Sequence, residues 1–87
     1  MTKTKILAQA KRIREKAKKE ATVGTYAEIG ELFRNYANED KMISFNDALR
    51  ILEPHLLSSH AQSKKLVKRT MNELLDSFID YTENVLS

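Results

Sequence analysis

Apolar residues in the last third of the chain recur with the spacing of an α-helix. They step alternately by four and three residues, at Val67, Met71, Leu74, Phe78, Tyr81 and Val85. Such steps place side chains on one face of a helix, so we predict a long helix over residues 61–86 with this seam in the core. Ser59 and Gln62, which have the spacing of a capping box, would start it. The acidic residues of the segment fall on the opposite face, which we expect to be exposed: Glu73, Asp76, Asp80 and Glu83.

A narrower apolar stripe runs along residues 3–21. It consists of Ile6, Ala10, Ile13 and Ala17. The rest of the segment is rich in Ala, Lys, Arg and Glu, which all favour helix formation. We predict one helix here, and we expect Gly24 to terminate it in the left-handed conformation.

A second helix is predicted to follow this glycine. Thr25 and Glu28 have the spacing of a capping box and would start the helix. Its inward face would consist of Tyr26, Ile29, Phe33, Tyr36 and Ala37. Gly30 lies beside that face, where it would allow another helix to approach closely.

A third helix is predicted after a polar turn over residues 38–41 and an apolar connector over residues 42–43. We expect Ser44 to cap it. Its inward residues would be Phe45, Ala48, Leu49, Ile51 and Leu52. Pro54 lacks a backbone N–H and clashes with the preceding turn, so we predict that this helix ends near Glu53 or continues through a kink.

These patterns together predict an all-α fold, a small antiparallel bundle of four helices with the long C-terminal helix as its central post. The chain has 87 residues, which is enough for one core and one domain over residues 1–87. Two glycines and one proline argue against a turn-rich β fold. Within the domain, residues 1–21 would form a basic helix able to act as a partly independent arm, and residues 25–87 the helical body.

Few residues are suited to catalysis or metal binding. The chain has no cysteine, which excludes disulfides, thiolate nucleophiles and cysteine-ligated zinc. His55 and His60 are five residues apart, on either side of the predicted break, and we interpret them as loop residues. Ser58, Ser59 and Ser63 match no nucleophile motif, and no glycine-rich phosphate loop is present. We therefore predict that the protein is not an enzyme and has no catalytic residue, metal or cofactor.

Residues 29–52 resemble the helix–loop–helix of EF-hand calcium-binding proteins. Ile43 stands in the place of the apolar loop residue, and Asp47 in the place of the last ligand. The segment departs from the family at three points: Tyr36 stands at the first ligand position, Lys41 replaces the bend glycine, and Asp47 is shorter than the usual glutamate. We therefore expect a helical corner that binds no calcium.

The net charge of +3 is distributed unevenly along the chain. Residues 1–20 contain eight Lys or Arg and two Glu, for a net charge of +6, whereas residues 21–87 carry a net charge of −3. A second basic cluster lies in residues 64–69. If the two clusters face the same way, they could neutralise several phosphates of a nucleic acid, or an acidic protein surface. The candidate binding residues are Lys11, Arg12, Arg14, Lys16, Lys18, Lys19, Lys64, Lys65, Lys68 and Arg69.

A protein-binding inhibitor or immunity factor is the main alternative. Small helical proteins of this kind include bacteriocin immunity proteins and phage-encoded inhibitors of host machinery, a similarity of size and class only. Residues beside the seam of the last helix widen its apolar stripe. The widened stripe would either be buried against two helices or dock on another chain, including a second copy of this one. These residues are Leu75, Ile79 and Leu86.

Attachment to a membrane surface ranks third among the functions considered. The apolar stripe of the first helix is narrow and contains neither Trp nor Phe, so it would insert only shallowly. No apolar run is long enough to span a bilayer, and the start of the chain lacks the apolar stretch of a secretory signal. We expect a cytoplasmic protein without a small-molecule substrate.

Overall fold

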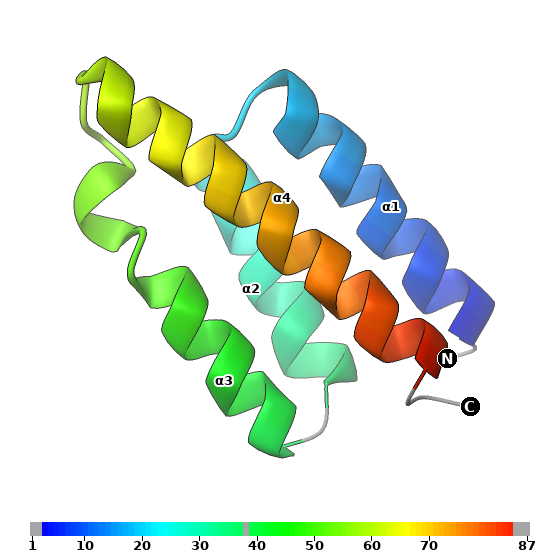
Figure 1. Ribbon diagram of the computed structural model, residues 1–87. Coiled ribbons are helices and arrows are strands. Elements are labelled where there is room, and N and C mark those ends of the chain that lie inside the picture. Colours follow the sequence, from blue (N-terminus) through cyan, green and yellow to red (C-terminus); the bar gives the residue numbers. More distant parts are fainter. Residues whose placement is uncertain (1–2, 38, 85–87) are drawn as a thin grey trace.

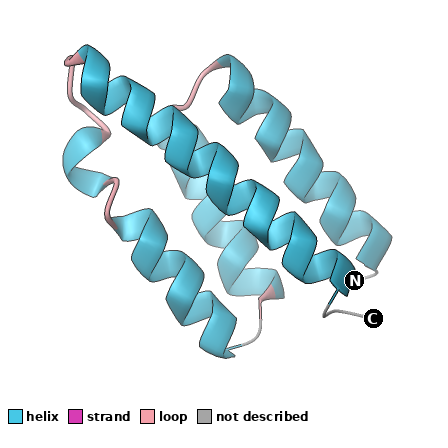
Figure 2. Cartoon of the chain, viewed as in Figure 1, coloured by secondary structure: helices cyan, strands magenta, loops and turns pink. Residues whose placement is uncertain are grey.

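The computed structural model describes residues 3–37 and 39–84, and every regular element in this part of the chain is helical (Figures 1 and 2). The elements are α1 (Lys3–Lys19), α2 (Val23–Tyr36), α3 (Glu39–Arg50), the short 3₁₀ helix η1 (Glu53–His55) and α4 (Ala61–Asn84). The predicted all-α fold is confirmed.

The other elements assemble on α4, which packs against α1, α2, α3 and η1. In Figure 1, α1 runs antiparallel along one side of α4, α2 lies behind it, and α3 lies on the side away from α1. Polar contacts between described residues also join α1 to α4. Lys3 Nζ donates to the carbonyl oxygen of Glu83 at 2.8 Å, and Arg14 Nη1 donates to Asp76 Oδ1 at 2.9 Å. The central position predicted for the last helix is confirmed.

The apolar seam predicted on the last helix lies in the core. Val67, Met71, Phe78 and Tyr81 are buried, Leu74 is partly buried against them, and Val85 lies outside the described residues. Leu75 and Ile79, beside the seam, are also buried, because α4 is covered from more than one side. The four acidic residues on the opposite face are exposed, as predicted: Glu73, Asp76, Asp80 and Glu83.

The stripe predicted on the first helix is also buried. Ile6, Ala10, Ile13 and Ala17 are each at most 7% exposed. Two of the four are alanines, whose small side chains allow close packing of helices. The stripe faces α4 and α2 along its length, so α1 is packed into the bundle and does not stand apart as an arm.

An aromatic cluster joins three helices in the centre of the bundle. The ring centroids of Phe33 in α2 and Phe45 in α3 are 4.8 Å apart, and those of Phe33 and Phe78 in α4 are 5.3 Å apart. Tyr81 adds an edge-on contact to Phe45 at 5.8 Å. Each such pair contributes about 0.5–1.5 kcal/mol beyond the burial of its area. The cluster therefore stabilises the positions of α2, α3 and α4 relative to one another.

Thr82 is a buried polar residue that the apolar pattern did not indicate. Its side chain is fully buried, and its Oγ1 donates to the carbonyl oxygen of Phe78 at 2.9 Å. This hydrogen bond satisfies a hydroxyl that would otherwise be costly to bury. A threonine can therefore occupy a core position on α4.

The predicted start of the second helix is wrong by three residues. Thr22 caps α2: its Oγ1 accepts from the N–H of Thr25 at 3.2 Å, and Thr25 Oγ1 accepts from the N–H of Thr22 at 3.4 Å. Thr25 thus takes the part that glutamate plays in the usual capping box. Gly24 lies inside the first turn of α2, and neither glycine has a positive φ, so the predicted left-handed termination at Gly24 is also wrong.

The predicted start of the third helix is wrong as well. α3 begins at Glu39, so most of the expected polar turn and all of the apolar connector are helical. Starting there places Phe45 and Leu49 on one face, where they pack against the core. Residues 37–38 alone join α2 to α3, which leaves no room for the twelve-residue loop of an EF-hand.

The end of α3 differs from the expected inward face. Leu49 and Leu52 are buried and Phe45 and Ala48 are partly buried, but Ile51 is 67% exposed and was wrongly assigned to the core. α3 ends at Arg50, because the chain then turns into η1.

The break expected at the only proline is present. Pro54 stands at the start of η1, where its missing N–H costs no helical hydrogen bond. Before α4, Ser58 Oγ accepts from the N–H of His60 at 3.1 Å, and the predicted Ser59–Gln62 capping box does not form.

The cap of α2 can be tested by substitution. Thr22→Ala should lower the free energy of unfolding by about 1 kcal/mol, because the N–H of Thr25 loses its acceptor. Chemical denaturation would measure this change, and Thr22→Ser should retain most of the stability. No measurable loss of stability in Thr22→Ala would show that this residue does not cap the helix.

Candidate functional site

Three of the six candidate cations in residues 11–19 are paired with carboxylates of the same chain. Arg14 contacts Asp76 at 2.9 Å, Lys16 contacts Glu28 at 3.0 Å, and Lys18 contacts Glu15 at 3.4 Å. The expectation that the whole basic segment would be free to meet a partner is therefore corrected at these three positions.

The three paired cations differ in how exposed their side chains are. The side chains of the Lys16 and Lys18 pairs are between 38% and 63% exposed. Exposed pairs of this kind contribute at most about 1 kcal/mol, so a phosphate could replace the carboxylate. Arg14 is different, since its side chain is only 25% exposed and its Nε is buried. Arg14 therefore belongs to the α1–α4 interface.

The remaining candidate cations form no ion pair within the part of the chain that the structure describes. On α1 they are Lys11, Arg12 and Lys19; on α4 they are Lys64, Lys65, Lys68 and Arg69. All seven are exposed. These side chains are available to an anionic partner.

The antiparallel pairing of α1 and α4 brings the two basic clusters together. Arg14 lies beside Asp76, so the next turn of α1, with Lys18, lies beside the preceding turns of α4. Those turns carry the basic residues 64–69. We use the name basic end for six residues: Lys18, Lys19, Lys64, Lys65, Lys68 and Arg69.

A pocket at the basic end confirms that the clusters meet. It has a volume of about 440 Å³, and Lys19 from α1 lines it together with Lys64 and Lys68 from α4. The hydroxyl-bearing residues Thr22 and Ser58 also line it. The arrangement can neutralise an anionic group from two helices at once, and sequence spacing alone gave no indication of the pocket.

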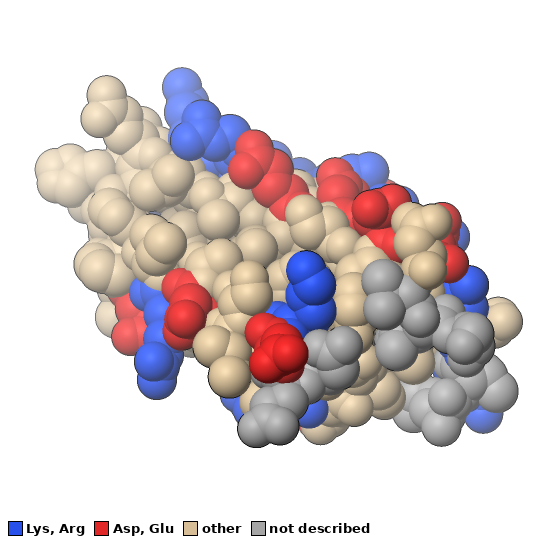
Figure 3. Space-filling model, turned by 60° about the horizontal axis from the view of Figure 1, so that its bottom comes forward, with Lys and Arg blue, Asp and Glu red and all other residues tan. Residues whose placement is uncertain are grey.

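Two further features make the basic end electrostatically positive. The first turn of α4 contains no acidic residue, and the N-terminal end of a helix carries a partial positive charge. Glu20 lines the pocket and offsets part of this charge. By contrast, Lys/Arg and Asp/Glu side chains are interspersed on the face shown in Figure 3, which offers no surface of one sign.

The other two basic candidates on α1 lie outside the basic end. Lys11 and Arg12 are about two helical turns before Lys19, roughly 10–12 Å along the helix axis. They would extend the positive surface along α1 and contact only a partner larger than the pocket.

The histidines do not gather with other ligands. His55 Nδ1 lies 3.1 Å from Ser63 Oγ, and His60 is exposed. Among the residues that the structure describes, no group of three or more His, Cys, Asp or Glu side chains could hold a metal ion. No described helix is long and apolar enough to cross a membrane.

The apolar surface considered for a protein partner or a homodimer is largely covered by the chain itself. Leu75 and Ile79, which widen the stripe on α4, are buried in the core. Leu86 lies outside the described residues. Comparison of the chain with protein-family models, curated proteins and solved structures gave no match.

Arg14 is held mainly by its packing between α1 and α4; its ion pair with Asp76 should be weak, because the Asp76 side chain is 62% exposed. In a double-mutant cycle with Arg14→Met and Asp76→Asn, we expect a coupling energy below about 1 kcal/mol that falls as salt is added. Chemical denaturation of the four proteins at two salt concentrations would measure it. A coupling above about 2 kcal/mol that resists salt would show instead that the pair behaves as a buried one.

Proposed function

We propose that the protein is a non-catalytic binding protein that uses the basic end to contact the phosphate backbone of nucleic acid. The observation that supports this proposal is the meeting of two basic clusters, about 45 residues apart in sequence, around one pocket. Lysine and arginine side chains that neutralise phosphates release condensed counterions, and this release supplies most of the affinity of non-specific binding.

The aromatic residues favour binding without base recognition. Phe33, Phe78 and Tyr81 are buried, and Phe45 packs on Phe33 in the core. The partly buried Tyr26 and Tyr36 do not line the pocket at the basic end, so no ring is placed there to stack on an unpaired base, which is how proteins commonly hold single strands. The contacts available at the basic end are those of cations and hydroxyls with phosphate oxygens, so the proposed binding depends little on sequence.

Two double variants that change the net charge equally, one at the basic end and one elsewhere, test this function. Lys65→Glu combined with Arg69→Glu should weaken binding to a nucleic acid duplex at least about tenfold at low salt, because two phosphate contacts become repulsive. Arg34→Glu combined with Arg50→Glu changes the net charge equally but lies on α2 and α3, and it should have a much smaller effect. Fluorescence anisotropy over a range of salt concentrations would measure both.

The salt dependence gives a second measure in the same experiment. The slope of log K against log salt should become less negative by about two in the Lys65→Glu, Arg69→Glu variant. Equal losses in the two double variants would mean that net charge alone is responsible. No binding by the unmodified protein at low salt would exclude the proposed function.

Removing an acidic neighbour should have the opposite effect. Asp76→Asn removes a negative charge beside the basic end, so duplex affinity should rise by a few-fold at low salt. Asp47→Asn on α3 removes the same charge at a distance and serves as the control. If both variants bind equally well, the charge of Asp76 has no local effect on the surface.

A further inference from the structure

A second concave surface lies between α2 and α3, away from the basic end. It is a groove with a volume of about 600 Å³, and it shares no lining residue with the pocket at the basic end. Grooves of this volume are within the usual range for small-molecule sites. The groove has polar groups on both walls, an apolar floor and one closed end.

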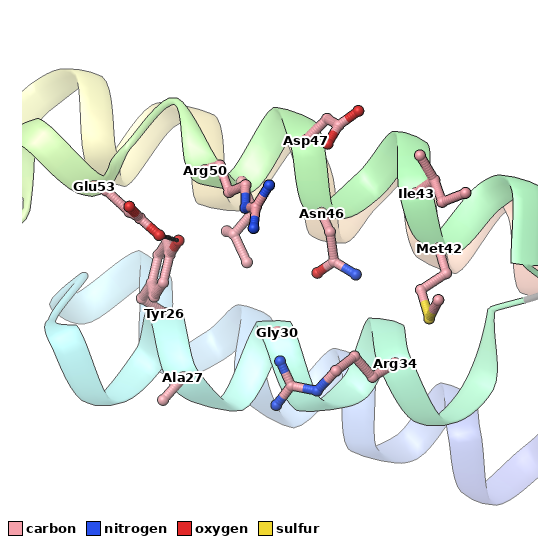
Figure 4. Close-up of a pocket in the computed structure, with 11 residues that line it drawn as sticks. Tyr26, Ala27, Gly30, Arg34, Met42, Ile43, Asn46, Asp47, Arg50 and Glu53 are labelled. Atoms are coloured by element: carbon pink, nitrogen blue, oxygen red, sulfur yellow. Dashed lines mark hydrogen bonds between the residues drawn. The ribbon is translucent and has the colours of Figure 1, made fainter.

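Two guanidinium groups and an amide point into the groove. Arg34 extends from α2, and Asn46 and Arg50 extend from α3, as Figure 4 shows. Within the described part of the chain, none of the three side chains forms an ion pair or hydrogen bond. Asp47, which also borders the groove, points away from it in Figure 4. No carboxylate lies between the two arginines in Figure 4, although Glu53, which lines the end of the groove, offsets part of the positive charge.

This arrangement is suited to an anionic group. Two cations that face one groove repel each other, and an anion between them replaces the repulsion with two attractions. Guanidinium groups also bind carboxylate and phosphate oxygens through paired hydrogen bonds. The Asn46 amide supplies one further N–H donor from the same wall as Arg50.

The floor of the groove is apolar and open at Gly30. A Cβ atom on Gly30 would lie 3.7 Å from Leu49 Cδ2 and 3.5 Å from Arg34 Nη1. These are ordinary contact distances, so α3 does not approach closely enough to require glycine here. The missing side chain instead leaves space beside the Arg34 guanidinium. Met42 lines the groove farther along α3, which extends the apolar surface.

Tyr26 and Glu53 close the end of the groove near η1. Tyr26 Oη donates to Glu53 Oε1 at 3.2 Å. Burial and the neighbouring Glu53 carboxylate raise the pKa of the Tyr26 phenol above its ordinary value of 10.0, against a smaller lowering by the Arg50 charge. The Glu53 carboxylate is thereby held by a hydrogen bond at the groove end.

We propose that this groove binds a small organic anion, a carboxylate or phosphate monoester carried on a short apolar body. Arg34 and Arg50 hold the anionic group from opposite walls, with Asn46 as an added donor. The apolar body lies on the floor formed by Gly30, Leu49 and Met42. The site is independent of the proposed nucleic-acid contact, so either can fail without the other.

Phenyl phosphate is a suitable probe for the phosphate monoester. Benzoate tests a carboxylate on the same aromatic ring, and benzyl alcohol serves as the uncharged control. In ¹H–¹⁵N NMR titrations of the full chain, phenyl phosphate should shift the amides of Gly30, Asn46 and Leu49, with Kd on the order of 1 mM. Benzyl alcohol should bind much more weakly. A response to benzoate equal to that of phenyl phosphate would assign the site to carboxylates as well as phosphates.

Two double variants, each replacing two cations with glutamine, distinguish binding in this groove from binding at the basic end. Arg34→Gln combined with Arg50→Gln should weaken phenyl phosphate binding about tenfold or more, because the charge-assisted hydrogen bonds are lost. Lys65→Gln combined with Arg69→Gln removes the same charge at the basic end and should leave this binding unchanged. Unchanged NMR spectra elsewhere in each variant would show that the fold is intact.

Three outcomes would overturn the proposal. Shifts confined to the basic end would show that the anion binds the lysines there. Equal affinity for benzyl alcohol would show that charge is not recognised, and full affinity in the Arg34→Gln, Arg50→Gln variant would remove the assigned residues. Binding of an acidic peptide without binding of phenyl phosphate or benzoate would make the groove a protein-docking surface instead.

Discussion

The burial of α4 by the other helices is the constraint on which the rest of the structure depends. A chain of 87 residues has material for one core, and α4 supplies the surface that every other element covers. A single neighbouring helix cannot bury its wide apolar stripe, so α1 packs on one side of α4 while α2 and α3 pack on the others. The aromatic cluster around Phe78 shows the result, because three helices contribute rings to one point.

The same packing sets the distribution of charge. Once the alanine-containing stripe of α1 is buried against α4 in the antiparallel direction, the basic C-terminal end of α1 must lie beside the basic N-terminal half of α4. Toward the other end of the pair, α4 presents acidic residues, and Asp76 meets Arg14. The positive surface at one end and the mixed surface beyond it thus follow from the direction of a single helix pairing.

The apolar periodicity was sufficient to predict the long helices and most of the core, because steps of three and four residues leave little ambiguity over many turns. The helix starts were not predictable in the same way. Thr22 caps α2 through a threonine–threonine pair, and α3 begins in a segment whose polar residues are typical of a turn. In both places, packing of Phe33 and Phe45 against the core outweighs the local signal.

Candidate cations could be identified from the sequence, but their partners could not. Arg14 and Asp76 are separated by 62 positions, and Arg34 and Arg50 lie on different helices, so each meeting depends on the tertiary arrangement.

The order of the helices also has a consequence during translation. α4 is the last of the four to be synthesised, yet α1, α2 and α3 all pack against it. While it remains in the ribosomal exit tunnel, the apolar faces of the first three helices lack their main partner. The nascent chain can form the local α2–α3 hairpin, joined by two residues, but its core can close only once α4 has left the tunnel. Until then, the apolar faces of α1, α2 and α3 remain uncovered by the helix that buries them in the folded bundle.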